Sequence, residues 1–282
     1  MRILLTGADG FTGRHLLPAA QKQGFELAGL ESDLTNPQAV SEEVAKINPT
    51  YVIHLAAISA VTHADEEAFY RVNLFGTQNL LQALSSLPIA PKKILLASSA
   101  NVYGNSSEGP ISELACAKPV NHYAISKLAM ELMSASFAEK LPIVIARPFN
   151  YTGIWHDTRF VAPKIVEYFK RRSSEIELGN LNVLREYNDV RVICQAYLEL
   201  LRVGIPGEAY NIASGRAVSL QTIISTLEKL SQHTMNVKVN PAFVRPNEIG
   251  ILSGSAEKIE SLIGPLAHPT LEETLAWMLE SG

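Results

Sequence analysis

Short apolar segments alternate with longer segments of helical periodicity along the first half of the chain. The apolar segments lack polar alternation and therefore predict buried parallel strands at 2–6, 25–30, 51–56, 93–98 and 142–147. The intervening segments predict helices at 11–23, 37–47, 66–87 and 122–139. This order predicts a parallel sheet with right-handed crossovers and helices on both faces, which is a Rossmann-type doubly wound α/β fold.

The pattern loosens after Arg147. Helices are predicted at 160–172, 188–203, 219–232 and 255–280, with strands at 175–179 and at 208–214, where the chain returns to the sheet. We therefore predict a Rossmann domain, 1–150 with 187–213 returning to it. The remainder, 151–186 and 214–282, is predicted to form a smaller, interleaved α/β substrate lobe. A cleft between the two is the expected ligand site.

Composition and charge narrow the classes of partner. The chain has 282 residues, of which 47% are hydrophobic and 18% charged, and its net charge is −4. This balance is typical of a globular protein and gives no field that favours nucleic acid or an anionic membrane. A phosphate-bearing ligand must therefore be held by local arginines or by backbone amides.

The cysteines and the apolar segments indicate in which cellular compartment the protein is expected. Cys116 and Cys194 lie far apart without metal-site spacing, so free thiols in a reducing environment are expected. The N-terminal MRILLTG enters a strand without a basic, apolar leader, and the run at 51–61 is too short to span a bilayer. We expect a cytoplasmic protein with no metal site.

Three glycines follow the first predicted strand and open the first predicted helix. Gly7, Gly10 and Gly13 of TGADGFTG allow a tight turn and a close approach of the backbone to a pyrophosphate at the helix N-terminus. The sequence therefore predicts a dinucleotide site. Glu31 is placed to bind the ribose hydroxyls of NAD, whereas Arg14 would suit the 2′-phosphate of NADP. Both side chains would equally fit a solvated surface, so NAD and NADP both stay open.

A tyrosine and a lysine four residues apart, in NHYAISK (121–127), lie on one face of a predicted helix. The ammonium of Lys127 is expected to lower the pKa of Tyr123, so that the phenol can exchange a proton with a carbonyl oxygen. Ser99, at the end of the fourth predicted strand, would hydrogen-bond the same oxygen. Such a pair is common on amphipathic helices. Only together with the glycine loop does it predict a reaction centre.

These motifs, with HLAA (54–57), VNLFGTQNLL (72–81) and SSANVYG (98–104), resemble the extended short-chain dehydrogenases/reductases. The resemblance implies a catalytic Ser99–Tyr123–Lys127 triad and a homodimer. It also implies that Asn73 braces the sheet edge beside the coenzyme and that Asp33 contacts adenine. The coenzyme site implied in full is Gly7, Gly10, Phe11, Thr12, Gly13, Arg14, Asp33, Leu34, Leu55, Ala56, Ala57, Asn73, Tyr123 and Lys127.

Segments further along resemble one branch of that family, the GDP-mannose 4,6-dehydratases and GDP-4-keto-6-deoxy-D-mannose reductases. They are ARPFNYTG (146–153), ELGNLNVLREYNDVR (177–191) and NPAFVRPNE (240–248). The likeness implies that Arg185 and Arg245 bind a diphosphate, that Glu248 binds the nucleoside ribose and that Asn150 lies at the cleft floor. For any single arginine, a surface salt bridge is the commoner explanation.

Some positions near the expected sugar pocket depart from this branch. His122 would orient the sugar or simply pack at the start of its helix, and 153–160 (GIWHDTRF) replaces a small Gly/Pro-rich loop. Dehydratases of the branch carry a glutamate two residues after the serine, where this chain has Asn101. An amide cannot transfer a proton at neutral pH, so Asn101 favours a reductase, unless it merely caps the strand end.

The leading hypothesis is therefore an NAD(P)H-dependent reductase of a nucleotide-linked 4-keto-6-deoxyhexose, with a GDP-linked sugar favoured. An epimerase that keeps NAD bound would use the same triad. A non-catalytic NAD(P)-binding sensor is the third alternative, against which the intact triad argues.

Overall fold

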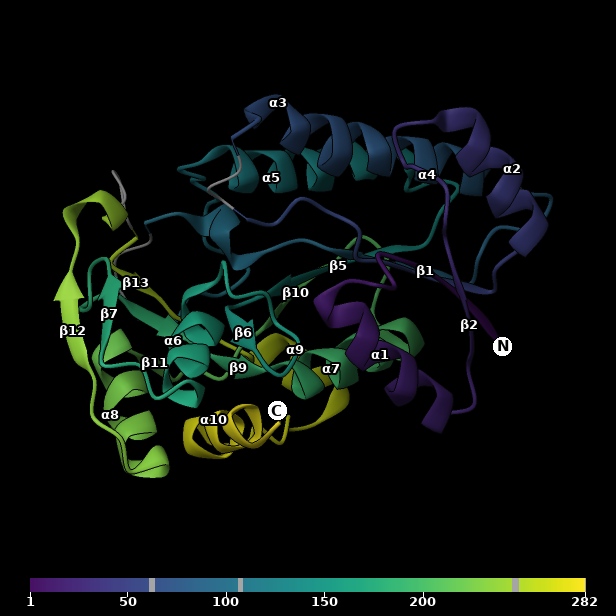
Figure 1. Ribbon diagram of the computed structural model, residues 1–282. Helices are drawn as coiled ribbons and strands as arrows, with labels where there is room; N and C mark the ends of the chain where they lie inside the picture. The colour runs from purple at the N-terminus through teal and green to yellow at the C-terminus, as the bar shows by residue number, and fades with distance from the viewer. Residues whose placement is uncertain (61–63, 106–108, 245–248, 282) are drawn as a thin grey trace.

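A computed structural model describes residues 1–60, 64–105, 109–244 and 249–281. Its centre is a six-stranded parallel sheet in the order β10-β5-β4-β3-β1-β2 (Figure 1). The strands are β1 (Arg2–Thr6), β2 (Glu26–Gly29), β3 (Tyr51–His54), β4 (Lys93–Ala97), β5 (Ile143–Pro148) and β10 (Ala209–Ile212). The strand order reverses at β1 and β3, where Thr6 pairs with His54. Open α/β sheets bind ligands beyond the carboxyl ends of the strands at such a point.

Helices cover both faces of this sheet, which explains why its strands lack polar alternation (Figure 1). One face carries α2 (Pro37–Ile47), α3 (Glu66–Phe69), the π-helical turn η1 (Tyr70–Gly76), α4 (Thr77–Ser85), α5 (His122–Ser134) and the 3₁₀ turn η3 (Ala135–Phe137). The other carries α1 (Phe11–Lys22), α7 (Val190–Val203) and α9 (Glu257–Ile263). The 3₁₀ turn η2 (Ala100–Tyr103) directly follows β4.

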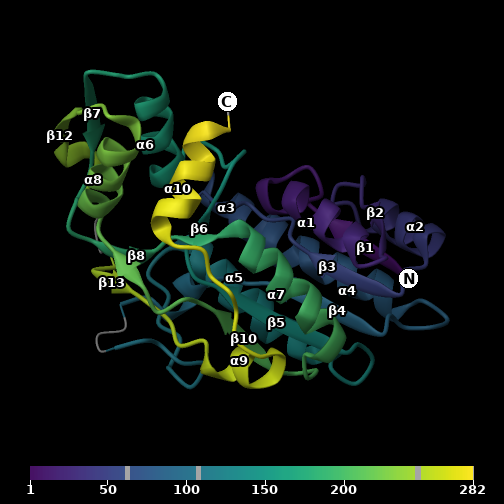
Figure 2. The ribbon, with the colours of Figure 1, turned by 90° about the horizontal axis from the view of Figure 1, so that it is seen from below.

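A second lobe lies at one end of the sheet (Figure 2). Its core contains α6 (Val161–Lys170), α8 (Leu220–Ser231), α10 (Leu271–Glu280) and the parallel pair β7 (Glu175–Leu178) and β12 (Asn236–Val239). Short strands connect it to the sheet domain: β6 (Tyr151–Thr152), β8 (Leu184–Glu186), β9 (Asn188–Asp189), β11 (Ala217–Val218) and β13 (Ile251–Leu252). The turn η4 (Pro241–Phe243) follows β12.

Two predicted helices are interrupted. The segment 66–87 is divided by the π-helical turn, and 255–280 is divided into α9 and α10. Gly264 has a φ of +81°, and the proline after it cannot continue a helix, so the second break has a local cause. Helix α9 packs against α7 and β10 on the sheet, although its residues fall in the range assigned by sequence to the substrate lobe. The domain boundaries themselves remain a prediction.

None of the helices in the described part of the chain has the length and hydropathy of a bilayer-spanning segment.

Candidate active site

The glycine loop is built for close backbone contact. Gly7 has a φ of +69°, and a Cβ there would lie 2.9 Å from the backbone nitrogen of Ala56. A Cβ on Gly13 would lie 2.4 Å from the carbonyl oxygens of Gly7 and Ala8. No described side chain caps the first turn of α1, whose N-cap is Gly10. The free N–H groups at the start of this helix can therefore receive a phosphate, and the loop fits a dinucleotide.

A buried chain of hydrogen bonds supports the sheet edge beside this loop. Oγ1 of Thr6 lies 2.7 Å from Nδ1 of His54, and Nε2 of His54 lies 2.7 Å from Oγ1 of Thr77. Thr77 donates its own proton to the carbonyl of Asn73, so it must accept one from Nε2 of the histidine. Burial lowers the pKa of His54 to about 3, which keeps the ring neutral. Nδ1 then accepts from Thr6.

The same threonine holds the next segment of the coenzyme edge. The backbone N–H groups of Leu55 and Ala56 donate to Oγ1 of Thr6 over 3.2 and 3.1 Å. His54 is therefore a structural hub that fixes the peptides against which Gly7 packs. Ala57, the last residue of this motif, is half-buried.

Asn73 connects this edge to the helix that carries the tyrosine. Its Oδ1 accepts from the backbone N–H of Ile58 over 2.9 Å, and its Nδ2 donates to Oγ of Ser126 over 3.0 Å. Ser126 in turn donates to the carbonyl oxygen of Tyr123 over 2.8 Å. Asn73 thus joins the segment that follows β3 to α5 by a continuous path of hydrogen bonds. Its contact with coenzyme stays a prediction.

The three proposed catalytic residues lie in one buried region. Ser99 follows β4 and caps η2, and Tyr123 and Lys127 lie one turn apart on α5. Relative exposure is 6% for Ser99, 9% for Tyr123 and 3% for Lys127, so charge that develops here is poorly screened by water. Nζ of Lys127 donates to the carbonyl oxygen of Ala97, the last residue of β4, over 2.7 Å.

The pKa of Tyr123 differs from the sequence expectation. Burial raises it above its ordinary value, and a hydrogen bond with Ser99 opposes that rise. Burial also lowers the pKa of Lys127 to about 8. The expected lowering of the tyrosine pKa by the lysine was wrong for the free protein, because removal of water from the phenolate outweighs its stabilisation. In this state Tyr123 is a proton donor rather than a base.

Asn101 contacts Ser99 twice. Its backbone N–H and its Nδ2 donate to Oγ of Ser99 over 3.2 and 3.1 Å. The hypothesis that Asn101 merely caps the strand end does not describe this contact, because Ser99 is itself the cap of η2.

Tyr151 and His156, which sequence reasoning did not select, lie at the glycine helix. The hydroxyl of Tyr151 lies 2.8 Å from Oγ1 of Thr12, and the ring of His156 stacks on Phe11 with centroids 4.2 Å apart. Burial lowers the pKa of His156 to about 4. The departure from the family at 153–160 was the available signal, and the structure places this segment against the first turns of α1.

Of the residues expected at the adenosine end, Arg14 and Asp33 are exposed and Leu34 is buried. Arg14 is exposed, and its Nε donates to the carbonyl oxygen of Asp9 over 2.9 Å. Asp33 is exposed, and its carboxylate accepts from the N–H and hydroxyl of Thr35. Leu34 is buried and packs over Gly76. These positions leave both coenzymes open.

The residues predicted to bind substrate are more dispersed. His122 lies between the hydroxyl of Tyr70, 2.8 Å from Nδ1, and the carboxylate of Glu66, 3.1 Å from Nε2. Asn150 is exposed at the end of β5. Arg185 on β8 donates to the carbonyl oxygens of Leu184, Ile249 and Gly250. Arg245 and Glu248 lie outside the described residues.

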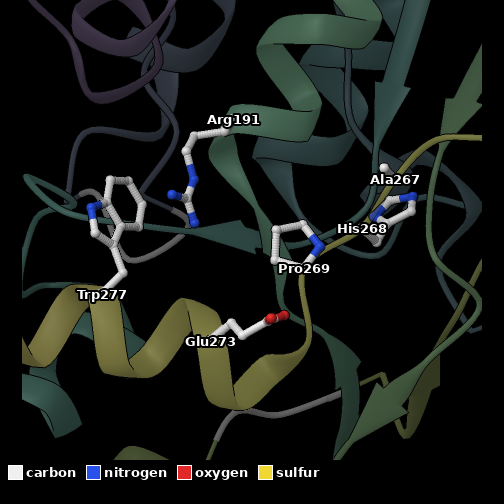
Figure 3. Close-up of a pocket in the computed structure, with 6 residues that line it drawn as sticks. All are labelled: Arg191, Ala267, His268, Pro269, Glu273 and Trp277. Atoms are coloured by element: carbon white, nitrogen blue, oxygen red, sulfur yellow. The ribbon is translucent and has the colours of Figure 1, made fainter.

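One pocket in the described part of the chain lies away from these residues. It has a volume of about 520 Å³ and is lined by Arg191, Ala267, His268, Pro269, Glu273 and Trp277 (Figure 3). Glu273 and Trp277 come from α10, and the Arg191 guanidinium lies 3.9 Å from the centroid of the Trp277 ring. None of the predicted site residues lines it. Within the described residues there is also no cluster of three or more His, Cys, Asp or Glu side chains suited to a metal ion.

Comparisons with known proteins identify the family of this chain. The family model described as GDP-mannose 4,6 dehydratase matches residues 28–278. GDP-6-deoxy-D-talose 4-dehydrogenase of Aggregatibacter actinomycetemcomitans is 35% identical, covering 94% of this chain and 92% of its own. GDP-6-deoxy-D-mannose reductase of Pseudomonas aeruginosa is 31% identical, covering 99% and 96%. A solved structure of RMD from Pseudomonas aeruginosa with NADPH is 30% identical, with a TM-score of 0.90 and coverage of 99% and 96%.

Proposed function

The chain belongs to the GDP-mannose 4,6 dehydratase family of extended short-chain dehydrogenases/reductases, and we propose that it reduces the 4-keto group of GDP-4-keto-6-deoxy-D-mannose with NADPH or NADH. The observation that carries the proposal is the amide of Asn101 on Ser99, beside the buried phenol of Tyr123. Elimination of water from a sugar needs a group that accepts a carbon-bound proton, which an amide does not do. Reduction of a ketone needs a hydride and one proton donor.

The names of the two relatives support this substrate. 6-Deoxy-D-talose and 6-deoxy-D-mannose differ only in configuration at C4, so one 4-keto sugar gives either of them when hydride arrives at opposite faces. A dehydrogenase of the first and a reductase of the second therefore share a ketone. The configuration of the product is a separate question that the experiment below answers.

Each residue of the triad has a distinct task in this reaction. A reduced nicotinamide coenzyme held by the glycine loop through its pyrophosphate would supply hydride to the carbonyl carbon. The hydroxyl of Tyr123 donates its proton to the ketone oxygen, and Ser99 hydrogen-bonds at the same place. The ammonium of Lys127 stabilises the phenolate that remains. Arg185 and Arg245 are proposed to hold the diphosphate, with Glu248 on the ribose and Asn150 and His122 at the sugar.

The pH dependence follows from the lysine. Because the pKa of Lys127 is about 8 and that of Tyr123 lies above its ordinary value, the lysine loses its proton first as pH rises. We expect kcat for ketone reduction to fall as pH rises through about 8, since the phenolate then loses its stabilising charge. A kcat that stays constant up to about pH 10, where free tyrosine ionises, would contradict this role.

The test is coenzyme absorbance after addition of GDP-4-keto-6-deoxy-D-mannose to the purified protein with NADPH or NADH. We expect stoichiometric oxidation of the coenzyme and loss of at least about a hundredfold in kcat for Tyr123→Phe. NMR of the sugar product gives the C4 configuration. No oxidation with either coenzyme would overturn the proposal, and tightly bound NAD(H) that copurifies would then favour an epimerase.

A further inference from the structure

One short segment holds the first turns of the glycine helix α1. It consists of residues 151–156, which follow β5, and we call it the strap. Oγ1 of Thr12 lies 2.8 Å from the hydroxyl of Tyr151. About one turn further along α1, Nε2 of His15 lies 2.9 Å from the carbonyl oxygen of Ile154. A carbonyl oxygen only accepts, so Nε2 carries the proton. Hydrogen bonds therefore tie the strap to two successive turns of α1.

Ring contacts complete the strap. The ring of His156 lies parallel to that of Phe11 with the centroids 4.2 Å apart, and the indole of Trp155 stacks on His15 at 4.9 Å. Burial lowers the pKa of both histidines, that of His156 to about 4, so neither ring brings a positive charge to the helix at neutral pH. Trp155 has a φ of +65°, which is unfavourable for a bulky side chain. The strap therefore positions the helix rather than attracting an anion to it, and it forms in spite of backbone strain.

The contact of Thr12 falls where the coenzyme phosphates are expected. The first internal backbone hydrogen bond of α1 is donated by the N–H of Arg14. The three N–H groups before it belong to Phe11, Thr12 and Gly13 and have no partner within the helix. Such groups can receive a pyrophosphate. Thr12 is the middle residue of the three, and its side chain is fixed by Tyr151. The direction of these donors therefore depends on where the strap holds Thr12.

We propose, resting on the coenzyme site of the proposed function, that Tyr151 is a positioning residue for the coenzyme. Through its hydrogen bond with Thr12 it fixes the turn of α1 that receives the pyrophosphate. The backbone of Tyr151 is itself held in β6, opposite Asn188 of β9, so the tyrosine is a rigid support. Donors that are fixed before the ligand arrives bind it with a smaller loss of entropy. Loss of either hydroxyl should therefore weaken coenzyme binding.

Tyr151→Phe and Thr12→Val each remove one hydroxyl and keep the shape of the side chain. Affinity for NADPH and NADH is measured on the purified protein from the change in coenzyme fluorescence. The coenzyme that binds should be held about threefold to tenfold more weakly in either variant. The double variant should lose no more than the larger single loss, because both changes remove the same contact. Thr12→Ser keeps the hydroxyl and should keep the affinity. Losses that multiply in the double variant would overturn the proposal.

A competing ligand locates the effect along the coenzyme. ADP-ribose has the pyrophosphate but no nicotinamide, and its 2′-phosphate is the matching ligand if NADPH is the coenzyme that binds. If Tyr151 acts on the pyrophosphate turn, Tyr151→Phe should weaken this ligand by the same factor as the whole coenzyme. A loss confined to the whole coenzyme would place the action of Tyr151 at the nicotinamide and overturn the proposal.

Tyr210→Phe is the matched control for a hydroxyl with a purely structural role. The hydroxyl of Tyr210 accepts from the backbone N–H of Ile205 over 3.2 Å, near the start of β10 and away from the carboxyl ends of the strands. A similar loss of stability in urea is expected for the two tyrosine variants, but only Tyr151→Phe should lose coenzyme affinity. If the native protein binds neither coenzyme, the proposed function and this inference both fail. Coenzyme binding that Tyr151→Phe leaves unchanged would overturn this inference alone.

Discussion

Two buried polar hubs hold the site in place, and they differ in design. His54 has a relative exposure of 1% and is neutral, with one hydroxyl partner for each ring nitrogen. Glu186 on β8 has an exposure of 0% and accepts from several groups on 214–215 and 253–254. In the histidine network, which forms a chain, each ring nitrogen has one hydroxyl partner. The glutamate network is a shell in which each oxygen has more than one donor.

The two networks show how a neutral and a charged side chain can each be buried. A neutral ring with matched hydroxyls needs little compensation. Glu186 forms no salt bridge with the described residues, so its carboxylate depends on N–H and O–H donors, and these buried donors lose their acceptor if it is removed. Removal of Glu186 should therefore lower the free energy of unfolding more than removal of His54. Loss of a single hydrogen-bonding partner should matter less for Glu186 than for His54.

The largest effect is expected for Glu186→Ala. Several buried donors lose their acceptor at once, so the free energy of unfolding should fall by about 3–5 kcal/mol in urea denaturation. Glu175→Ala is the matched control, because Glu175 forms an exposed pair with Lys238 and its removal should cost less than about 1 kcal/mol. Similar losses for the two glutamates would show that the shell is not the anchor of β8.

His54→Leu keeps the bulk of the ring but removes both nitrogens. Thr6 and Thr77 lose partners in a dry environment, and a loss of about 2–4 kcal/mol is expected by the same measurement. NADPH affinity should fall as well, because Thr6 holds the peptides under Gly7. His233→Leu, a half-buried histidine of the other lobe, should leave that affinity unchanged. An unaltered NADPH affinity in His54→Leu would show that the His54 network does not support the coenzyme site.

The contribution of His54 to stability should depend on pH. The pKa of His54 is about 3 in the folded protein and about 6.5 when unfolded, so below pH 6.5 the unfolded state binds the proton and stability is lost. Between pH 7 and pH 5 the stability gap between the native protein and His54→Leu should therefore shrink by about 2 kcal/mol. Urea denaturation at both pH values measures it. A gap that stays constant would mean that His54 takes up a proton in the folded state as readily as in the unfolded state.

The smallest changes in stability are expected when a single hydroxyl is removed from either network. Ser214→Ala removes one hydroxyl from the Glu186 shell and leaves the backbone N–H of Ser214 in place at 2.7 Å, so less than about 0.5 kcal/mol should be lost. Thr77→Val removes the hydroxyl that lies 2.7 Å from Nε2 of His54 and should cost about 1–2 kcal/mol. A larger loss of stability for Ser214→Ala than for Thr77→Val would contradict the proposed difference between the Glu186 and His54 networks.

The sequence could predict those parts of the site that lie at regular positions of a parallel sheet. Gly7, His54 and Ser99 each follow or end a buried strand, and parallel strands bring their carboxyl ends to one edge. Tyr123 and Lys127 could be paired because helical spacing is local. Apolar runs and helical periods therefore determined the sheet, most helices and the location of the proposed triad.

Only the tertiary structure decided what these groups do to one another. The rise in the pKa of Tyr123 comes from burial by distant segments, and the contact of His156 with Phe11 joins a loop to a helix far away in the chain. Glu186 gave no signal, because its donors come from irregular turns whose positions follow no period. Spacing along a chain determines which side chains share an element, whereas desolvation and hydrogen bonding depend on everything packed around them.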